Sequence, residues 1–149
     1  MRRLMGAMMQ ALLITAITVG ALWLYVRATR PAPGECRVTY VYDGDTVALD
    51  CGTGDMTARL IGLNAPETRD AACPAEAEAG HLATKRLRAL VSGADQMAVS
   101  RQGHDRYGRE LVRLWIDGRD VAATLVSEGL AEAYLGGQRR NWCAAGVRP

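Results

Sequence analysis

The chain has 149 residues, the length of one ordinary domain, and its content of 49% apolar and 23% charged residues excludes a disordered chain. The net charge of +2 hides a split, because four of the 18 basic residues and none of the 16 acidic residues precede Pro31. From Pro31 onward 14 basic residues face 16 acidic ones, which excludes a strongly basic domain that coats nucleic acid, so any binding of a polyanion must be local.

The N-terminal segment Leu4–Val26 carries no charge over 23 residues. As a helix rising ~1.5 Å per residue it is roughly 34 Å long, enough to cross a hydrocarbon layer of ~30 Å. Trp23 and Tyr25 lie near its end, where interfacial aromatic residues are expected. Residues 1–30 are therefore predicted to be an uncleaved, single-pass signal anchor. The small residues of Val26-Arg27-Ala28 leave a cleaved signal peptide as the alternative.

All four cysteines follow this segment, and an even number in a translocated domain predicts two disulfides. Cys36 and Cys51 flank a predicted hairpin and could face each other, which leaves Cys73 to pair with Cys143. Four cysteines allow three pairings, and free buried thiols are the alternative. The predicted location is outside the cytoplasm, with the domain on the periplasmic or extracellular side, or secreted if the signal is cleaved.

The predicted elements begin after a Pro/Gly-rich linker over residues 31–35, and residues 36–149 form the folded domain. Residues 37–42 and 46–49 are rich in β-branched and aromatic side chains and predict a hairpin, followed by a turn over residues 51–55. A third strand over residues 57–63 is predicted to stop at Asn64-Ala65-Pro66, because proline cannot donate to a strand ladder.

A helix over residues 75–91 follows, with Pro74 suited to its first turn. Two further strands (96–100 and 110–116) flank a polar loop over residues 103–108, and a second helix covers 121–128. Five short strands with helices between and after them predict a mainly β fold, a five-stranded β-barrel of the OB type with packed α-helices.

Three polar groups adjoin the predicted strands. Asp43-Gly44-Asp45-Thr46 places two carboxylates in a tight turn, where Gly44 permits unusual backbone angles and the oxygens suit a hard cation such as Ca²⁺. The alternative is a hairpin turn whose aspartates cap their own backbone, and the tetrapeptide alone favours that alternative.

Arg59 interrupts an apolar strand, so its guanidinium either enters the barrel mouth to bind a phosphate or faces water at a sheet edge. Glu67 lies in the loop after that strand. It is either a solvated surface residue or a group that positions or deprotonates a water molecule.

In the cluster Asp105–Arg109, Gly108 permits a turn that lets Tyr107 and Arg109 face one site. There an arginine neutralises phosphate charge and a tyrosine stacks on a base or sugar; the alternative is a basic surface loop.

Together these groups resemble the staphylococcal nuclease (thermonuclease) family of calcium-dependent phosphodiesterases. The resemblance runs from about Val38 to Tyr134 and rests on the joint order of four motifs: Asp43–Thr46, Arg59–Glu67, Asp105–Arg109 and Gly129-Leu130-Ala131. It implies an OB-type barrel with a cleft at one rim.

The resemblance also implies site residues. Asp45 and the carbonyl of Ala65 would bind one Ca²⁺, Arg59 and Arg109 would hold the scissile phosphate, and Glu67 would act on the attacking water. Tyr107 and Asp105 would contribute to substrate binding.

Two departures from the family pattern stand out. Asn64 replaces a metal-binding aspartate; its amide oxygen can still bind Ca²⁺ but brings no charge, so the count of direct carboxylates, on which calcium affinity depends, falls from two to one. Little chain follows Tyr134, so the family's long last helix is absent or shrunken, and a bridged Cys143 would take over its clamping role.

We therefore expect a monomeric, metal-dependent endonuclease. The resemblance implies that it hydrolyses DNA and RNA, preferably single-stranded, and leaves 3′-phosphorylated products. The alternative, motivated by Asn64, is a catalytically weak nuclease-like barrel that serves as a membrane-tethered binding module for nucleic acid or protein.

Overall fold

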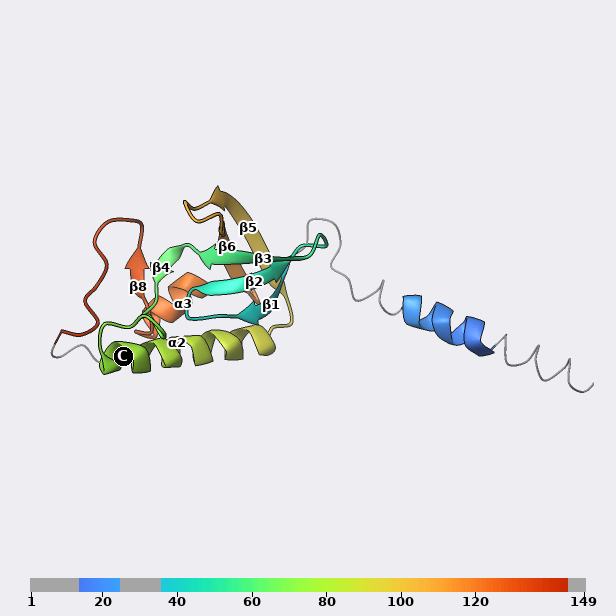
Figure 1. Cartoon of the computed structure of the whole chain (residues 1–149), viewed down its shortest axis with the longest axis horizontal. Helices are drawn as coiled ribbons and strands as arrows, with labels where there is room; N and C mark the ends of the chain where they lie inside the picture. Colours follow the sequence, from blue (N-terminus) through green and yellow to red (C-terminus); the bar gives the residue numbers. More distant parts are fainter. Residues whose placement is uncertain (1–13, 25–35, 145–149) are drawn as a thin grey trace, which may run out of the picture.

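The computed structural model describes residues 14–24 and 36–144 (Figure 1). Residues 14–24 are helical. Within the described ranges no helix combines the length and the apolar character needed to cross a bilayer. The predicted anchor Leu4–Val26 extends beyond the described residues, and the linker 31–35 lies wholly outside them. The anchor, the cleavage site and the location of the domain therefore stay predictions.

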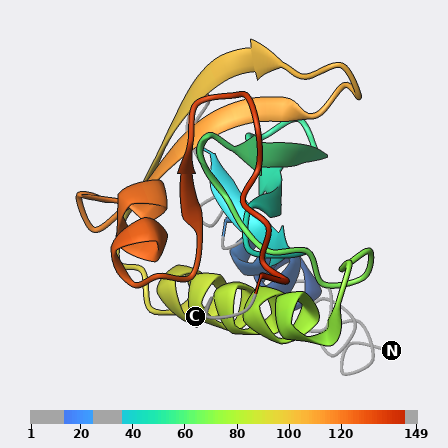
Figure 2. The ribbon, with the colours of Figure 1, turned by 90° about the vertical axis from the view of Figure 1, so that its left-hand side faces the viewer.

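The domain is built on a mixed six-stranded sheet. Its strands pair in the order β1–β2–β3–β6–β5, with β7 beside β6; β3 and β6 run parallel and the other pairs are antiparallel. The sheet curls into a half-barrel, with β1 and β5 in contact where its ends approach each other (Figure 2). The strands are β1 (Arg37–Val41), β2 (Thr46–Asp50), β3 (Asp55–Leu60), β5 (Met97–His104), β6 (Glu110–Ile116) and β7 (Arg119–Asp120).

The predicted third strand divides into two strands. It leaves the main sheet at Ile61, because Gly62 adopts a φ of +90° that turns the chain. The next three residues form β4 (Gly62–Asn64), which pairs with a short strand absent from the prediction, β8 (Glu132–Tyr134). The fourth predicted strand is also longer than expected, since β5 continues to His104 and shortens the polar turn to residues 105–109.

Two helices close the half-barrel. Helix α2 (Pro74–Ser92) has proline in its first turn, as predicted, and buries Ala79, Ala83 and Leu87 under the sheet. Helix α3 (Val121–Ser127) begins at Asp120, whose carboxylate accepts from the amide of Ala123 at 3.0 Å. The apolar core lies between these helices and the concave face of the sheet.

Both predicted disulfides are present. Cys36–Cys51 closes the β1–β2 hairpin, and Cys73–Cys143 joins the residue before α2 to the tail. From Leu135 to Ala144 the chain forms no helix. We call residues 135–143 the strap; Figure 2 shows it running from β8 back to the start of α2.

Candidate active site

The two aspartates of the first turn have different environments. Asp43 accepts a hydrogen bond from the amide of Asp45 at 3.0 Å, so it caps the turn. Asp45 is 3% exposed and points inward, where it pairs with Arg59 and accepts from the amide of Ala65 at 2.9 Å. Burial raises the pKa of Asp45 to about 7, although Arg59 opposes the rise. The turn-capping interpretation therefore holds for Asp43, whereas Asp45 binds Arg59 and the amide of Ala65, and its role as a metal ligand stays a prediction.

Gly44 is required for space and not for its backbone angles. Its φ lies outside the left-handed region, which corrects the explanation drawn from the sequence. A Cβ atom there would lie 2.6 Å from the Cβ of Ala65 and 2.8 Å from that of Ala83 on α2. Glycine therefore lets the turn pack against α2 and holds Asp45 beside Ala65.

Arg59 lies inside the molecule and not at a sheet edge. Its position on β3 is opposite Thr46, its side chain is 12% exposed, and its guanidinium contacts two of the predicted metal ligands. One nitrogen pairs with Asp45 and another donates to Oδ1 of Asn64 at 3.2 Å. The side-chain oxygens of Asp45 and Asn64 therefore converge on a single cationic group.

The loop that carries Glu67 rests on α2. A Cβ atom at Gly80 would lie 2.6 Å from the carbonyl oxygen of Glu67, so only glycine allows this approach. The amide of Glu67 donates to Glu76 at 3.4 Å, and its half-exposed carboxylate lies 3.7 Å from the guanidinium of Arg139 on the strap. Glu67 is thus positioned by the backbone while its carboxylate stays open to water.

The turn at the end of β5 presents Arg109 and Tyr107. Asp105, predicted to bind substrate, accepts hydrogen bonds from the backbone of Tyr107 and from both the amide and Nε of Arg109. Loss of water raises the pKa of Asp105, but these hydrogen bonds outweigh it and the pKa is lowered. Tyr107 is 70% exposed, with the guanidinium groups of Arg106 and Arg109 at 4.8 and 5.8 Å from its ring. The carboxylate of Asp105 therefore orients Arg109.

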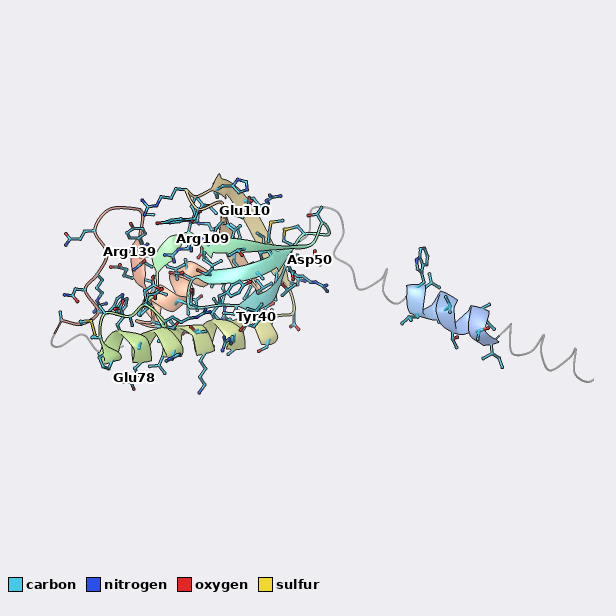
Figure 3. All side chains as sticks on the ribbon, in the orientation of Figure 1. Tyr40, Asp50, Glu78, Arg109, Glu110 and Arg139 are labelled. Atoms are coloured by element: carbon cyan, nitrogen blue, oxygen red, sulfur yellow. A yellow bond between two sulfur atoms is a disulfide. The ribbon has the colours of Figure 1, made fainter. Side chains whose placement is uncertain are left out.

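A cavity of about 620 Å³ brings some of these groups together, whereas Asp45, Asn64 and Glu67 are not among the residues that line it. Arg59, Arg109 and Tyr107 line it together with residues of β8 and the strap, and Figure 3 labels Arg109 and Arg139. Five arginines and a single carboxylate, that of Asp105, face the cavity: Arg59, Arg106, Arg109, Arg113 and Arg139. A locally positive site for an anion thus exists on a domain whose net charge is slightly negative.

The donor set suits a hard cation. No group of three or more His, Cys, Asp or Glu side chains gathers anywhere in residues 14–24 and 36–144. The carboxylate of Asp45 and the amide oxygen of Asn64 both contact the guanidinium of Arg59, and the backbone N–H of Ala65 donates to Asp45. Oxygen donors of this kind are the ligands that Ca²⁺ prefers, so the residues fit one such ion.

Two residues of this site escaped the sequence analysis. Glu132 on β8 accepts from Nδ2 of Asn64 at 3.0 Å, and Arg139 reaches Glu67 from the strap. The motif Gly129-Leu130-Ala131 ends one residue before Glu132, and the pair Gly136-Gly137 marks the bend of the strap. These signals indicate chain reversals but do not identify the side chains that meet.

Comparison with known proteins shows similarity to a family of nucleases. A family model described as staphylococcal nuclease homologue matches residues 57–142. Thermonuclease of Staphylococcus intermedius is 31% identical over 96 residues, covering 64% of this chain and 57% of that protein. Endonuclease YncB of Bacillus subtilis is 35% identical over 96 residues (62% and 45%), and protein ParB of Escherichia coli is 30% identical over 145 residues (90% and 73%). The chain spans about half the length of the first two relatives.

Proposed function

The chain belongs to the staphylococcal nuclease family, and from this we propose that it is an endonuclease that hydrolyses phosphodiester bonds of DNA and RNA with the help of one Ca²⁺ ion. The main support is the cavity in which Arg59 and Arg109 come together with Tyr107, next to Asp45 and Asn64.

The two arginines bind the scissile phosphate. Guanidinium groups match phosphate oxygens with paired hydrogen bonds and offset the charge that grows on them in the transition state. Arg59 approaches from the buried side and Arg109 from the exposed turn. Asp45, Asn64 and Ala65 would hold the ion, which supplies Lewis-acid stabilisation of the phosphoryl oxygens.

Glu67 acts on the nucleophilic water. Its carboxylate accepts a proton as the water oxygen bonds to phosphorus in line with the departing 5′ oxygen. The P–O5′ bond breaks, the 5′ oxygen takes up a proton, and the phosphate stays on the 3′ side. The half-exposed carboxylate beside Arg139 supports this role.

The preferred substrate is single-stranded. Tyr107 and Tyr134 both line the cavity, and stacking on their rings requires an unpaired base. The slightly acidic domain also disfavours the extended phosphate contacts by which proteins hold duplexes. The proposed enzyme is a monomer that acts outside the cytoplasm, tethered by or released from residues 1–30. Two disulfides support that location.

The test is cleavage of an end-labelled single-stranded oligonucleotide by the purified full-length chain. Cleavage is expected with Ca²⁺ and lost with chelator, and mass spectrometry should find 3′-phosphates on the products. A binding module is the second candidate, favoured by the single direct carboxylate of the site. Retention of the oligonucleotide without cleavage at saturating Ca²⁺ would establish that candidate and reject the enzyme.

A further inference from the structure

The amide of Asn64 lies between a cation and an anion. Its Oδ1 accepts from Arg59 at 3.2 Å, and its Nδ2 donates to Oε1 of Glu132 at 3.0 Å. Asn64 and Glu132 are also direct partners in the β4–β8 ladder, so the backbone register independently brings the two side chains together. Asn64 is buried, with 3% of its surface exposed.

The chemistry of the partners allows a single orientation of this amide. A carboxylate at ordinary pH only accepts hydrogen bonds, and a guanidinium only donates them. Nδ2 must therefore face Glu132, and Oδ1 must face Arg59 and the oxygens of the proposed cation site. Glu132 is itself held, because the amide of Arg140 on the strap donates to the same Oε1 at 2.8 Å.

We propose that Glu132 is a positioning residue of the active site, matched to Asn64: it orients the amide so that Oδ1 points at the cation site, and it supplies the negative charge that an amide lacks. The part of this proposal that concerns the cation rests on the proposed function. The pairing itself rests on the geometry alone.

The pairing gives a physical reason for the departure at position 64. An aspartate there would place two carboxylates about as far apart as the present hydrogen bond of 3.0 Å. Like charges at that separation cannot both stay ionised without a large cost. Asparagine is therefore the residue that Glu132 requires, and the aspartate common in the family requires a different residue at position 132.

The first experiment is a double-mutant cycle on the full-length chain, unfolded thermally in chelator at pH 8. Asn64→Asp should lower the unfolding midpoint by about 5 °C, as expected for a loss of the order of one hydrogen bond. Glu132→Gln should lower it less. The double variant Asn64→Asp/Glu132→Gln exchanges amide and carboxylate, so its midpoint should lie above that of Asn64→Asp. Additive losses would overturn the pairing, as would failure of the double variant to fold.

The second experiment measures Ca²⁺ binding by calorimetry. Glu132→Gln should weaken affinity about 10-fold, the lower end of the range for residues that orient a metal ligand. Glu128→Gln is the matched control, because Glu128 pairs with Arg86 away from the site. Equal affinities for the two variants would overturn the role of Glu132 toward the cation. If coupling appears in chelator but the wild-type chain neither binds Ca²⁺ nor cleaves, the pairing stands and the proposed function fails.

Discussion

The site has an inner half and an outer half that are held in different ways. The inner half (Asp45, Arg59, Asn64 and Glu132) comes from strands and one turn and is mostly buried. The outer half (Asp105, Tyr107, Arg109 and Arg139) comes from an exposed turn and the strap, and Tyr107 is 70% exposed.

The two halves differ in the interactions that hold their side chains in place. In the inner half every side chain is committed to a neighbour at close range, and removing one leaves a buried polar atom without a partner. In the outer half the side chains are more exposed and their ion pairs contribute less stability; Asp105 orients Arg109, and the Cys73–Cys143 disulfide holds the strap. Substitutions in the inner half should therefore affect folding and catalysis together, whereas those in the outer half should mainly affect substrate binding.

The largest difference in unfolding free energy is expected between alanine variants of two aspartates that each bind an arginine. Asp45→Ala leaves Arg59 buried and unpaired, and breaking a buried ion pair typically costs ~3–5 kcal/mol of unfolding free energy. Asp105→Ala frees Arg109, which is more exposed than Arg59, and should change the unfolding free energy much less. Chemical denaturation of both variants in chelator measures the difference. Equal losses would remove the distinction between the two halves.

The two disulfides provide the next comparison. Loop entropy predicts a loss of about 4.4 kcal/mol for Cys73→Ser/Cys143→Ser and about 3 kcal/mol for Cys36→Ser/Cys51→Ser, from sequence separations of 70 and 15 residues. Only the first double variant frees the strap, so it alone should raise KM for a single-stranded oligonucleotide. Steady-state kinetics at a temperature where both variants are folded tests this, and a similar rise in KM for both would contradict it.

A side chain added at Gly80, against the loop that carries Glu67, should cause an intermediate loss of stability and of activity. Gly80→Ala drives a methyl group against the carbonyl oxygen of Glu67, and overpacking of this kind costs ~1–3 kcal/mol. Because the loop must move, kcat should fall as well. The control is Gly20→Ala, where a Cβ atom meets nothing within 4 Å. A Gly80→Ala protein with wild-type kcat would show that the position of the loop does not matter.

A smaller, pH-dependent change in stability is expected on substitution of Glu110. Hydrogen bonds from Arg101 lower the pKa of this carboxylate, which anchors the end of β5. A lowered pKa stabilises the fold above the pKa of an unfolded glutamate, ~4.3, and the contribution disappears as the pH falls through the folded value. Glu110→Gln should thus be less stable than wild type at pH 7, with the gap closing at acidic pH. A gap independent of pH would contradict this.

The smallest changes in stability and in kinetics are expected for Arg139→Ala. The pair with Glu67 spans 3.7 Å and both side chains are about half exposed, so the unfolding free energy should change by less than ~0.5 kcal/mol. The loss of one cation from the cavity should raise KM a few-fold and leave kcat nearly unchanged. A fall in kcat at constant KM would instead show that Arg139 controls Glu67.

The sequence predicted the parts of this molecule that leave a local signal. Enrichment in β-branched and aromatic residues predicted the hairpin, and periodicity predicted α2 within one residue at each end. The resemblance implied that Arg59 and Arg109 hold one phosphate, and both line one cavity. The short strands β7 and β8 left no such signal, because two or three residues show no period, and β4 was predicted only as the end of β3. The contact of Asn64 with Glu132, 68 residues apart, depends on the register of two of those strands and could not be foreseen.

The most direct test of the whole account is kcat on a single-stranded oligonucleotide at saturating Ca²⁺ for Arg59→Ala, Glu67→Ala and Arg109→Ala. Arg86→Ala, which breaks an exposed ion pair with Glu128, serves as the control. The account predicts losses of at least ~10²-fold for each of the three variants, as for other groups that stabilise charge in a transition state, and wild-type kcat for the control. Undiminished cleavage by all three variants would contradict it.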